Sequence, residues 1–501
     1  MKLHNRIFYK IVTNNNFFWS ILVLLFIVSR LATWFYPYDS DHWIFYYVGK
    51  MFAEGGVLYI SAWDHKPPII FVINAIMHLI LSDNIIFHRI LFTLFAIFDC
   101  FLFYRLALII TKKINTKEFT YLSRISLLFY VFFRNLSQFT SSGNNTENFG
   151  LTFLLLMVLS YFSYLNNKKS RYLLASGFCF SILFFLKGNF ALFSLPIILN
   201  IIISNLKTLK RIIRQLFLYG LPLAFHTLIW LLYFYKNDAI NDFFTASFIF
   251  SSKYMKSAWA GHVSPQGIFI VVLLSFVLPF FLYSLTLIKN LRKNIEPELT
   301  ILSYFSIISF VFIIMLGSFY PYYLLITFPV MILGFIYFWE NAKPITFKIG
   351  VSILILSSLL AWTTSMKQFY NFFGGPVAAE AKENKDISEY IKSVTSENDK
   401  IVAYTYGATF YELTNRKSGS RFISASVLLL DEREKYGFGF SDIYIKDMEA
   451  SKPKYVIYPA GNDSLYFQNK KLVEYFKSYY SENKSFEDYI ILQRNPNETV
   501  E

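Results

Sequence analysis

The chain has 501 residues, of which 55% are hydrophobic, 20% are aromatic and only 16% are charged. Soluble proteins carry about 25% charged residues, so this apolar surface is too large for a globular core and is suited to hydrocarbon. The net charge of +14 would also fit a nucleic-acid-binding protein. However, the basic residues form short clusters between apolar runs, which indicates the positive-inside topology of a membrane protein.

A membrane-spanning helix needs about 20 apolar residues. By this criterion the sequence predicts about eleven spans, near 17–36, 88–110, 121–137, 149–165, 172–187, 189–206, 215–235, 267–288, 300–317, 322–339 and 347–365. No cleavage site follows the first run, so we expect it to stay as an anchor with the basic N-terminus inside. The spans are expected to carry almost no charge except Arg30, which is near enough to the outer end to extend to the interface.

Orientation follows from the positions of Lys and Arg, which favour inner loops. With the N-terminus inside, the inner loops contain the clusters Lys112, Lys113 and Lys117; Lys168, Lys169 and Arg171; Lys207, Lys210, Arg211 and Arg214; Lys289, Arg292 and Lys293; and Lys343 and Lys348. An odd number of spans then places the C-terminal segment outside.

The first outer loop, 37–87, is long and mixed in character. It contains an amphipathic stretch at 41–54, where Ile44, Tyr47, Val48 and Met51 share one helical face. A second apolar run, 69–81, is too short to span the bilayer and is expected to lie in the interface or to re-enter.

The composition changes after about residue 366, where charged residues become frequent. Strands are predicted at 400–406, 421–424, 455–459 and 489–493, and helices at 386–394 and 473–480. We therefore expect two domains: a transmembrane domain, 1–365, and a small soluble extracytoplasmic α/β domain, 366–501.

Ionisable residues gather just beyond the first span, in Asp39-Ser40-Asp41-His42 and in Asp64-His65-Lys66-Pro67-Pro68. Asp39-x-Asp41 is similar to the acidic pairs that hold a metal and a nucleotide sugar, but nucleotide sugars are made inside the cell. The alternative is that Asp39, Ser40 or Asp41 only caps the helix that starts here. Proline holds the preceding residue extended, so Lys66 can present its ammonium to a phosphate at the lipid surface, or can simply anchor an interfacial helix.

Further candidates lie at the outer ends of later spans. Arg89 opens the second span, and its planar guanidinium suits a phosphate, although interface anchoring is the simpler role. Glu147 lies at the N-terminus of the fourth span, where the helix dipole alone favours a carboxylate. Lys187 ends the fifth span and can meet a phosphate or a sugar, or extend to the interface. Tyr322 belongs to an aromatic run that can stack on sugar rings or form part of an interface belt.

The sequence contains no phosphate-binding glycine-rich loop, no metal-spaced Cys/His set and no Ser/His/Asp order. Cys100 and Cys179 lie in separate apolar runs and are expected to be buried thiols that form no disulfide. ATP-driven chemistry therefore has no support, and an enzyme acting outside needs a substrate that is already activated. A sugar on a polyprenyl phosphate meets that requirement.

Taken together, these features resemble the GT-C membrane glycosyltransferases, in particular the protein-mannosyltransferase-like family that includes the bacterial aminoarabinose transferases of lipid A. The resemblance covers most of the chain and is specific in the first outer loop. It rests on the Asp that opens the amphipathic helix, Tyr47-x-Gly49, Gly55-Gly56-Val57-Leu58-Tyr59, Asp64-His65-Lys66-Pro67-Pro68, Arg89, Asn145-Thr146-Glu147, Phe185-Leu186-Lys187, Tyr320-Pro321-Tyr322-Tyr323, Thr414-Asn415-Arg416 and Ser420-Arg421-Phe422. The expected fold class is an α-helical polytopic membrane protein of GT-C type with a small C-terminal α/β extracytoplasmic domain.

The resemblance implies that Asp41 is the catalytic carboxylate and that Lys66 and Arg89 bind the carrier phosphate. The other substrate-binding candidates are Asp39, Asp64, His65, Glu147, Lys187 and Tyr322. Many relatives have an acidic residue where this chain has His42 or His65, so a metal role is in doubt, although Asp64 can compensate. The cofactor is therefore left open: a divalent cation is the candidate, but the chemistry requires none.

Phosphate is a good leaving group, so one base for the acceptor hydroxyl and cations for the departing phosphate suffice. We expect an inverting glycosyltransferase that moves a hexosyl or pentosyl group from a polyprenyl phosphate to a lipid, polysaccharide or protein. It would act at the outer face of the bacterial cytoplasmic membrane, with no nucleic-acid partner. The alternatives are a lipid-linked sugar transporter or flippase, which uncharged spans disfavour, and a membrane oligosaccharide polymerase or ligase. The sequence leaves the sugar, the acceptor and the oligomeric state open.

Overall fold

The computed structural model describes residues 12–36, 38–259, 296–315, 320–341, 344–433, 435–460 and 469–496. The chain divides into two compact units. Unit 1 comprises Met1–Tyr36, Ile85–Leu231 and Ala258–Phe369, and unit 2 comprises Pro37–Asn84, Leu232–Ser257 and Tyr370–Glu501. Each unit is described by itself below.

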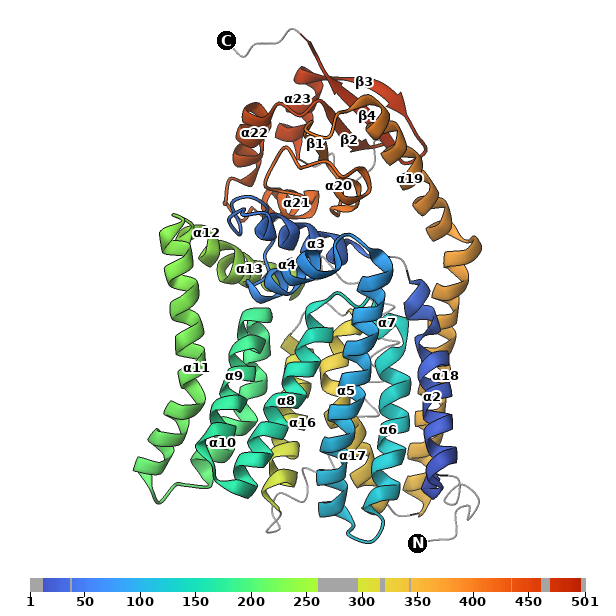
Figure 1. Ribbon diagram of the computed structural model, residues 1–501, viewed down its shortest axis with the longest axis vertical. Helices are drawn as coiled ribbons and strands as arrows, with labels where there is room; N and C mark the ends of the chain where they lie inside the picture. Colours follow the sequence, from blue (N-terminus) through green and yellow to red (C-terminus); the bar gives the residue numbers. More distant parts are fainter. Residues whose placement is uncertain are drawn as a thin grey trace. The chain divides into compact units, whose positions relative to one another are not determined.

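Unit 1 is built mainly from apolar helices whose axes are roughly parallel, joined by shorter helical segments (Figure 1). They are α2 (Asn15–Phe35), α5 (Ile85–Ile114), α6 (Phe119–Asn135), α7 (Ser137–Thr140), α8 (Thr146–Asn167), α9 (Ser170–Leu186), the 3₁₀ helix η1 (Gly188–Ser194), α10 (Leu195–Ile203), α11 (Leu209–Lys236), α16 (Pro297–Met315), the 3₁₀ helix η5 (Pro321–Thr327), α17 (Phe328–Asn341) and α18 (Pro344–Gly374). The last residues of α11 and α18 belong to unit 2.

The predicted spans that the structure describes fall on these helices. Within the described residues, six helical segments are long and apolar enough to cross a membrane, at Asn15–Phe35, Ile85–Ile114, Thr146–Asn167, Leu209–Lys236, Pro297–Met315 and Pro321–Asn341. Ser170–Leu186 and Gly188–Ile203 are apolar but shorter. The predicted span at 267–288 lies outside the described residues, so the polytopic helical class is confirmed but the count of about eleven is not.

The expectation that the spans carry almost no charge is wrong. Arg134 of α6 donates from Nε and Nη2 to Oδ2 of Asp99 in α5, at 3.0 and 2.8 Å, and both side chains are fully buried. Arg30 is also buried, and it hydrogen-bonds Thr93 and Asn135 instead of extending to the interface. Most of these buried donors and acceptors therefore have partners, as burial away from water requires, although Arg134 Nη1 has none among the described residues.

Unit 2 contains the two helices of the 37–87 loop together with the C-terminal segment. Its elements are α3 (Ser40–Ala53), α4 (Ile69–Leu81), α12 (Ile240–Phe244), the π-helix η2 (Thr245–Phe250), α13 (Ser251–Trp259), α19 (Pro376–Val394), β1 (Ile401–Ala403), α20 (Thr409–Thr414), α21 (Ala425–Arg433), α22 (Phe440–Ser451), β2 (Tyr455–Pro459), α23 (Lys470–Tyr479), β3 (Tyr480–Ser485) and β4 (Tyr489–Arg494). The assignment of residues 1–365 to one domain and 366–501 to another stays a prediction.

The four strands form one sheet in the order β1-β2-β4-β3, with β1 and β2 parallel and the other pairs antiparallel. The strands predicted within 400–406 and at 455–459 and 489–493 are confirmed. The strand predicted at 421–424 is wrong, because this segment instead makes a single bridge, between Phe422 and Trp63. Strand β3 was not predicted, because its residues after Tyr480 are polar and exposed and show no apolar alternation.

The amphipathic stretch of the first loop forms α3, and its predicted apolar face is mostly buried. Ile44, Tyr47 and Val48 are 1–6% exposed. Helix α4 packs directly on α3 at Gly49, where a Cβ atom would lie 2.5 Å from Cβ of Asn74. Only glycine allows this close approach, and it fixes the two loop helices against each other.

A charge cluster in which Lys50 and Glu412 are buried and Asp83 is exposed also holds α3 in place. Lys50 Nζ of α3 lies 3.0 Å from Asp83 Oδ2, beyond the end of α4, and 3.2 Å from Glu412 Oε2 of α20. Tyr46 Oη donates to Asp83 Oδ1 at 2.6 Å. Burial raises the pKa of Glu412 to about 7 although Lys50 opposes the rise, and Asp83 adds to it.

The Glu412 carboxyl predicts a pH-dependent stability. Because its pKa is about 7 in the folded protein against 4.5 ordinarily, the folded state holds this proton more tightly. Its contribution is therefore fully present below about pH 4.5 and is lost as pH rises through 7. Thermal unfolding in detergent should show wild type losing on the order of 3 kcal/mol more than Glu412→Gln between pH 5 and pH 8. The exposed Glu397→Gln is the control, and parallel curves for wild type and Glu412→Gln would contradict this assignment.

Candidate functional site

The two carboxylates at the start of α3 have different positions. Asp39 is the N-cap, and its Oδ1 accepts a hydrogen bond from the backbone N–H of His42 at 2.9 Å. Asp41 lies in the first turn and is partly exposed. The sequence left open which residue caps this helix, and the structure assigns that role to Asp39, so capping does not account for Asp41.

The second motif of the first loop forms a compact cluster of charges. Lys66 Nζ lies 2.7 Å from His65 Nε2, and the Lys66 backbone N–H donates to Asp64 Oδ2 at 3.1 Å. His65 Nδ1 faces Asp64 Oδ1 at 3.4 Å, which is long for a hydrogen bond. Burial alone would raise the pKa of Asp64, but His65 and Lys66 outweigh it and hold the pKa at about 2.

The Asp41 carboxylate acts electrostatically on His65 of this cluster. Burial and Lys66 lower the pKa of His65, whereas Asp64 and Asp41 act in the opposite direction. At neutral pH the imidazole is therefore neutral, with Nε2 able to accept from the Lys66 ammonium and Nδ1–H directed to Asp64. Both motifs of the first loop thus belong to unit 2. There the Lys66 ammonium interacts electrostatically with Asp64 and His65, and Asp41 acts on His65.

The backbone around Lys66 is held from several sides. Tyr59 Oη donates to the Lys66 carbonyl at 2.9 Å, and Ser251 Oγ donates to the His65 carbonyl at 3.0 Å. Pro67 and Pro68 are buried, and α4 begins directly after them. Lys66 is thus a partly exposed ammonium on a fixed backbone, as the Lys-Pro-Pro sequence predicted.

Three candidates of unit 1 lie together. Lys187 Nζ binds Oε1 of the buried Glu147 at 2.6 Å and lies 4.0 Å from the ring centroid of Tyr323. The ring of Tyr322 lies 4.8 Å from that of Tyr323. Asn145 is the N-cap of α8, so the Glu147 carboxylate is directed to Lys187 and Thr146 and does not cap the helix. Glu147, Lys187 and Tyr322 therefore form one polar and aromatic cluster.

Arg89 has a different environment from the one expected of a phosphate ligand. Its guanidinium donates to the carbonyls of Thr33, Trp34 and Tyr36 at the C-terminal end of α2. This geometry gives Arg89 a structural role at the end of α2, where helix carbonyls need partners from outside the helix, and its role toward phosphate stays a prediction. Lys66 and Arg89 belong to different units, so their approach to one phosphate stays a prediction.

Some groups near these clusters were missed from the sequence. Lys50 and Asp83 are separated from Glu412 by more than 300 residues, so spacing gave no signal. Asp242 and Arg421 line a cavity and were not singled out as site residues. Within the described ranges, no group of three or more His, Cys, Asp or Glu side chains is placed to hold a metal ion.

Comparisons with known proteins agree with this architecture. Residues 65–230 match the model of the family described as dolichyl-phosphate-mannose-protein mannosyltransferase. The structure resembles that of ArnT from Cupriavidus metallidurans in the apo state, with 11% identity and a TM-score of 0.58, over 94% of this chain and 98% of that chain. It also resembles the archaeal oligosaccharyltransferase AglB from Archaeoglobus fulgidus in complex with an inhibitory peptide and a dolichol-phosphate. That likeness has 12% identity and a TM-score of 0.52, over 93% of this chain and 72% of that chain.

No curated protein sequence matches the chain significantly. At identities near 12% the structural likeness shows the fold alone, and that fold is the GT-C fold of membrane glycosyltransferases. The resemblance to the GT-C membrane glycosyltransferases is confirmed. The matched region begins at His65, so it contains Lys66 and Arg89 but not Asp41.

Proposed function

We propose that the protein is an inverting glycosyltransferase that moves a sugar from a polyprenyl-phosphate carrier to an acceptor hydroxyl. It acts on the outer face of the bacterial cytoplasmic membrane, and its acceptor is a lipid, a polysaccharide or a protein. One observation carries the proposal: Asp39 caps α3, while Asp41 lies within electrostatic reach of the cluster that contains Lys66. A base and a phosphate-binding cation are the two groups that this reaction needs.

The reaction is a single displacement. The acceptor oxygen forms its bond to the anomeric carbon while the bond from that carbon to the phosphate oxygen breaks. The acceptor proton passes to Asp41, and the phosphate keeps the electron pair of the broken bond. Lys66 stabilises the negative charge that develops on the departing phosphate, and attack from the opposite side inverts the anomeric carbon.

The other clusters have supporting roles in this proposal. Asp64 and His65 position the Lys66 ammonium, because they contact its backbone N–H and its Nζ respectively. The Glu147–Lys187 pair and Tyr322 bind substrate, with the tyrosines available for stacking on a sugar ring. A polyprenyl-phosphate donor is further supported by AglB, whose structure was determined with a dolichol-phosphate.

Lys66 provides a direct test of the carrier site. Replacing Lys66 with Ala removes a charge-assisted contact to phosphate and should weaken binding of a polyprenyl phosphate by about 2 kcal/mol, or roughly 30-fold. The double Lys66→Ala, Arg89→Ala variant should bind still less, but Arg89 also holds the end of α2, so its effect includes a loss of stability. Lys417→Ala, an exposed lysine of unit 2, is the control. Unchanged carrier affinity in Lys66→Ala would remove Lys66 from the phosphate site.

The test of the function as a whole is a comparison of donors. Purified protein should release sugar from a polyprenyl-phosphate monosaccharide and should not act on a polyprenyl-diphosphate oligosaccharide. Activity on the oligosaccharide alone would favour a polymerase or ligase. Movement of the lipid across proteoliposomes without release of the sugar would favour a flippase.

The outer location predicts the topology of the C-terminus. The basic loops place the N-terminus inside, and an odd number of spans places residues beyond 370 outside. A reporter that is active only in the cytoplasm, fused after Glu501, should be silent, and one that is active only outside should report. The reverse result would place Asp41 and Lys66 on the cytoplasmic side and would contradict the use of an outer-face donor.

A further inference from the structure

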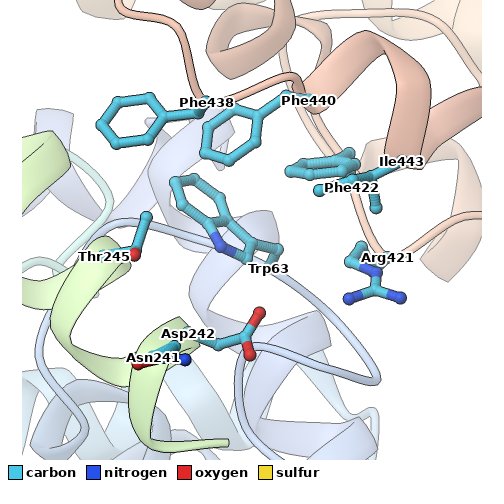
Figure 2. Close-up of a pocket in the computed structure, with 9 residues that line it drawn as sticks. All are labelled: Trp63, Asn241, Asp242, Thr245, Arg421, Phe422, Phe438, Phe440 and Ile443. Carbon is cyan, nitrogen blue, oxygen red and sulfur yellow. The ribbon is translucent and has the colours of Figure 1, made fainter.

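Unit 2 contains a cavity of about 170 Å³ between α12 and the 421–443 segment of the C-terminal region (Figure 2). Four aromatic side chains line it: Trp63, Phe422, Phe438 and Phe440. The rings of Trp63 and Phe440 lie 4.9 Å apart, and those of Phe438 and Phe440 are stacked at 5.1 Å. An engineered cavity of about 150 Å³ holds benzene, so this cavity has room for one six-membered ring.

The cavity also contains a carboxylate. Figure 2 shows Asp242 pointing toward Trp63, with the guanidinium of Arg421 on the same side of the cavity. Arg421 is already paired, since its Nε and Nη2 lie 3.1 and 3.3 Å from the carboxylate of Asp447. Burial raises the pKa of Asp242, and the electrostatic effect of Arg421 only partly opposes this rise. The polar wall therefore offers a hydrogen-bond acceptor and little free positive charge.

This combination selects a class of ligand. A phosphate would be repelled by Asp242, and an acyl chain would bury that carboxylate without a partner, which is costly. A sugar ring satisfies both kinds of wall, because its C–H groups can lie on the negative faces of the aromatic rings while its hydroxyls donate to the carboxylate. Apolar walls with a few fixed polar groups are also the usual form of a small-molecule site.

The cavity adjoins the cluster proposed to do the chemistry. Trp63 directly precedes Asp64, and its backbone N–H donates to the Arg421 carbonyl at 2.7 Å. The ring of Phe250 lies 5.3 Å from that of Trp63 and 5.6 Å from that of His65. Trp63 of the cavity wall and His65 of the charge cluster therefore lie in one short segment and pack against the same ring, that of Phe250.

We propose that this cavity binds one sugar ring of the acceptor, so that the acceptor is a glycan or a glycolipid and the C-terminal segment completes its binding site. That the bound sugar belongs to the acceptor rests on the proposed function. The affinity of the cavity for a sugar does not, and it can be measured without turnover. The proposal gives Asp242 and Phe438 a role in sugar recognition, and no sequence motif had indicated a role for either residue.

The experiment uses the full-length protein in lipid nanodiscs. Saturation-transfer difference NMR is recorded with the methyl α- and β-pyranosides of glucose, galactose and mannose. Wild type should bind at least one of them. Asp242→Asn, which loses the charged acceptor, and Phe438→Leu, which loses the aromatic face, should each bind it about tenfold more weakly or worse. Asp238→Asn is the matched control, because Asp238 is exposed and its left-handed backbone conformation suits Asn equally well.

The outcomes separate this inference from the proposed function. Absence of binding by wild type to every glycoside, or equal binding by the Asp242 and Asp238 variants, would overturn it. Binding of the polyprenyl phosphate should be the same in all these proteins, which shows that the variants are folded. Glycoside binding that depends on Asp242, in a protein that fails to use any polyprenyl-phosphate sugar, would support the sugar site while contradicting the transferase reaction.

Discussion

Asp41→Asn is expected to lower turnover on a polyprenyl-phosphate sugar by about 10²–10⁴-fold, the usual contribution of a general base. The substitution keeps the size of the side chain and its position in the first turn of α3. It removes the ability to accept the acceptor proton, since an amide is not protonated near neutral pH. The measurement is single-turnover transfer by purified protein, together with carrier binding, which should stay within about twofold of wild type because Lys66 is intact.

Asp39→Asn is the matched comparison for Asp41→Asn. Asn caps helices about as well as Asp, so a residue whose task is capping survives this change. Since Asp39 accepts the hydrogen bond from His42 N–H, its Asn variant should keep near-normal stability and turnover. Near-normal turnover in the Asp41 variant would return Asp41 to a structural role. Loss of turnover in the Asp39 variant alone would identify Asp39 as the base.

Features set by local sequence were predictable. The 3.6-residue spacing of Ile44, Tyr47 and Val48 gives α3 an apolar face, and that face is buried. The Lys-Pro-Pro motif gave Lys66 a fixed backbone, because proline restricts the residue before it wherever the chain goes. Membrane helices were located by their length and apolar composition, because any helix that crosses the hydrocarbon core must be about 20 residues long and mostly apolar.

Features set by long-range contacts were not predictable. The segment 421–424 has the composition of a strand, but its Phe422 bridges to Trp63, some 360 residues earlier, and takes no place in the sheet. The pairing of Lys50 with Glu412, and the cavity around Asp242, depend equally on which segments fold against the first loop. A single sequence carries propensity and periodicity, and neither specifies such partners.

The buried Asp99–Arg134 pair of unit 1 was also not predictable from the sequence, and it is relevant to the transporter alternative. Asp99 and Arg134 lie in apolar helices, where ionisable residues commonly mark an ion or substrate pathway. Here they are bound to each other, and Thr152 donates a further hydrogen bond to Asp99. The absence of charge from the spans can therefore no longer be used as an argument against a transporter. The question becomes whether the Asp99–Arg134 pair has a structural or a functional role.

Removal of Arg134 alone, as Arg134→Met, is expected to cost about 3–5 kcal/mol of stability, because Asp99 is left as a buried charge without its partner. The double variant Asp99→Leu, Arg134→Met removes both charges and should recover most of that loss, since an apolar pair of similar volume avoids the desolvation penalty. Stability is measured by unfolding in detergent, and turnover is measured on the double variant. A structural pair in a glycosyltransferase allows near-normal turnover once both charges are gone. A double variant that is as stable as wild type but inactive would show that the two charges are needed for function and are not only structural.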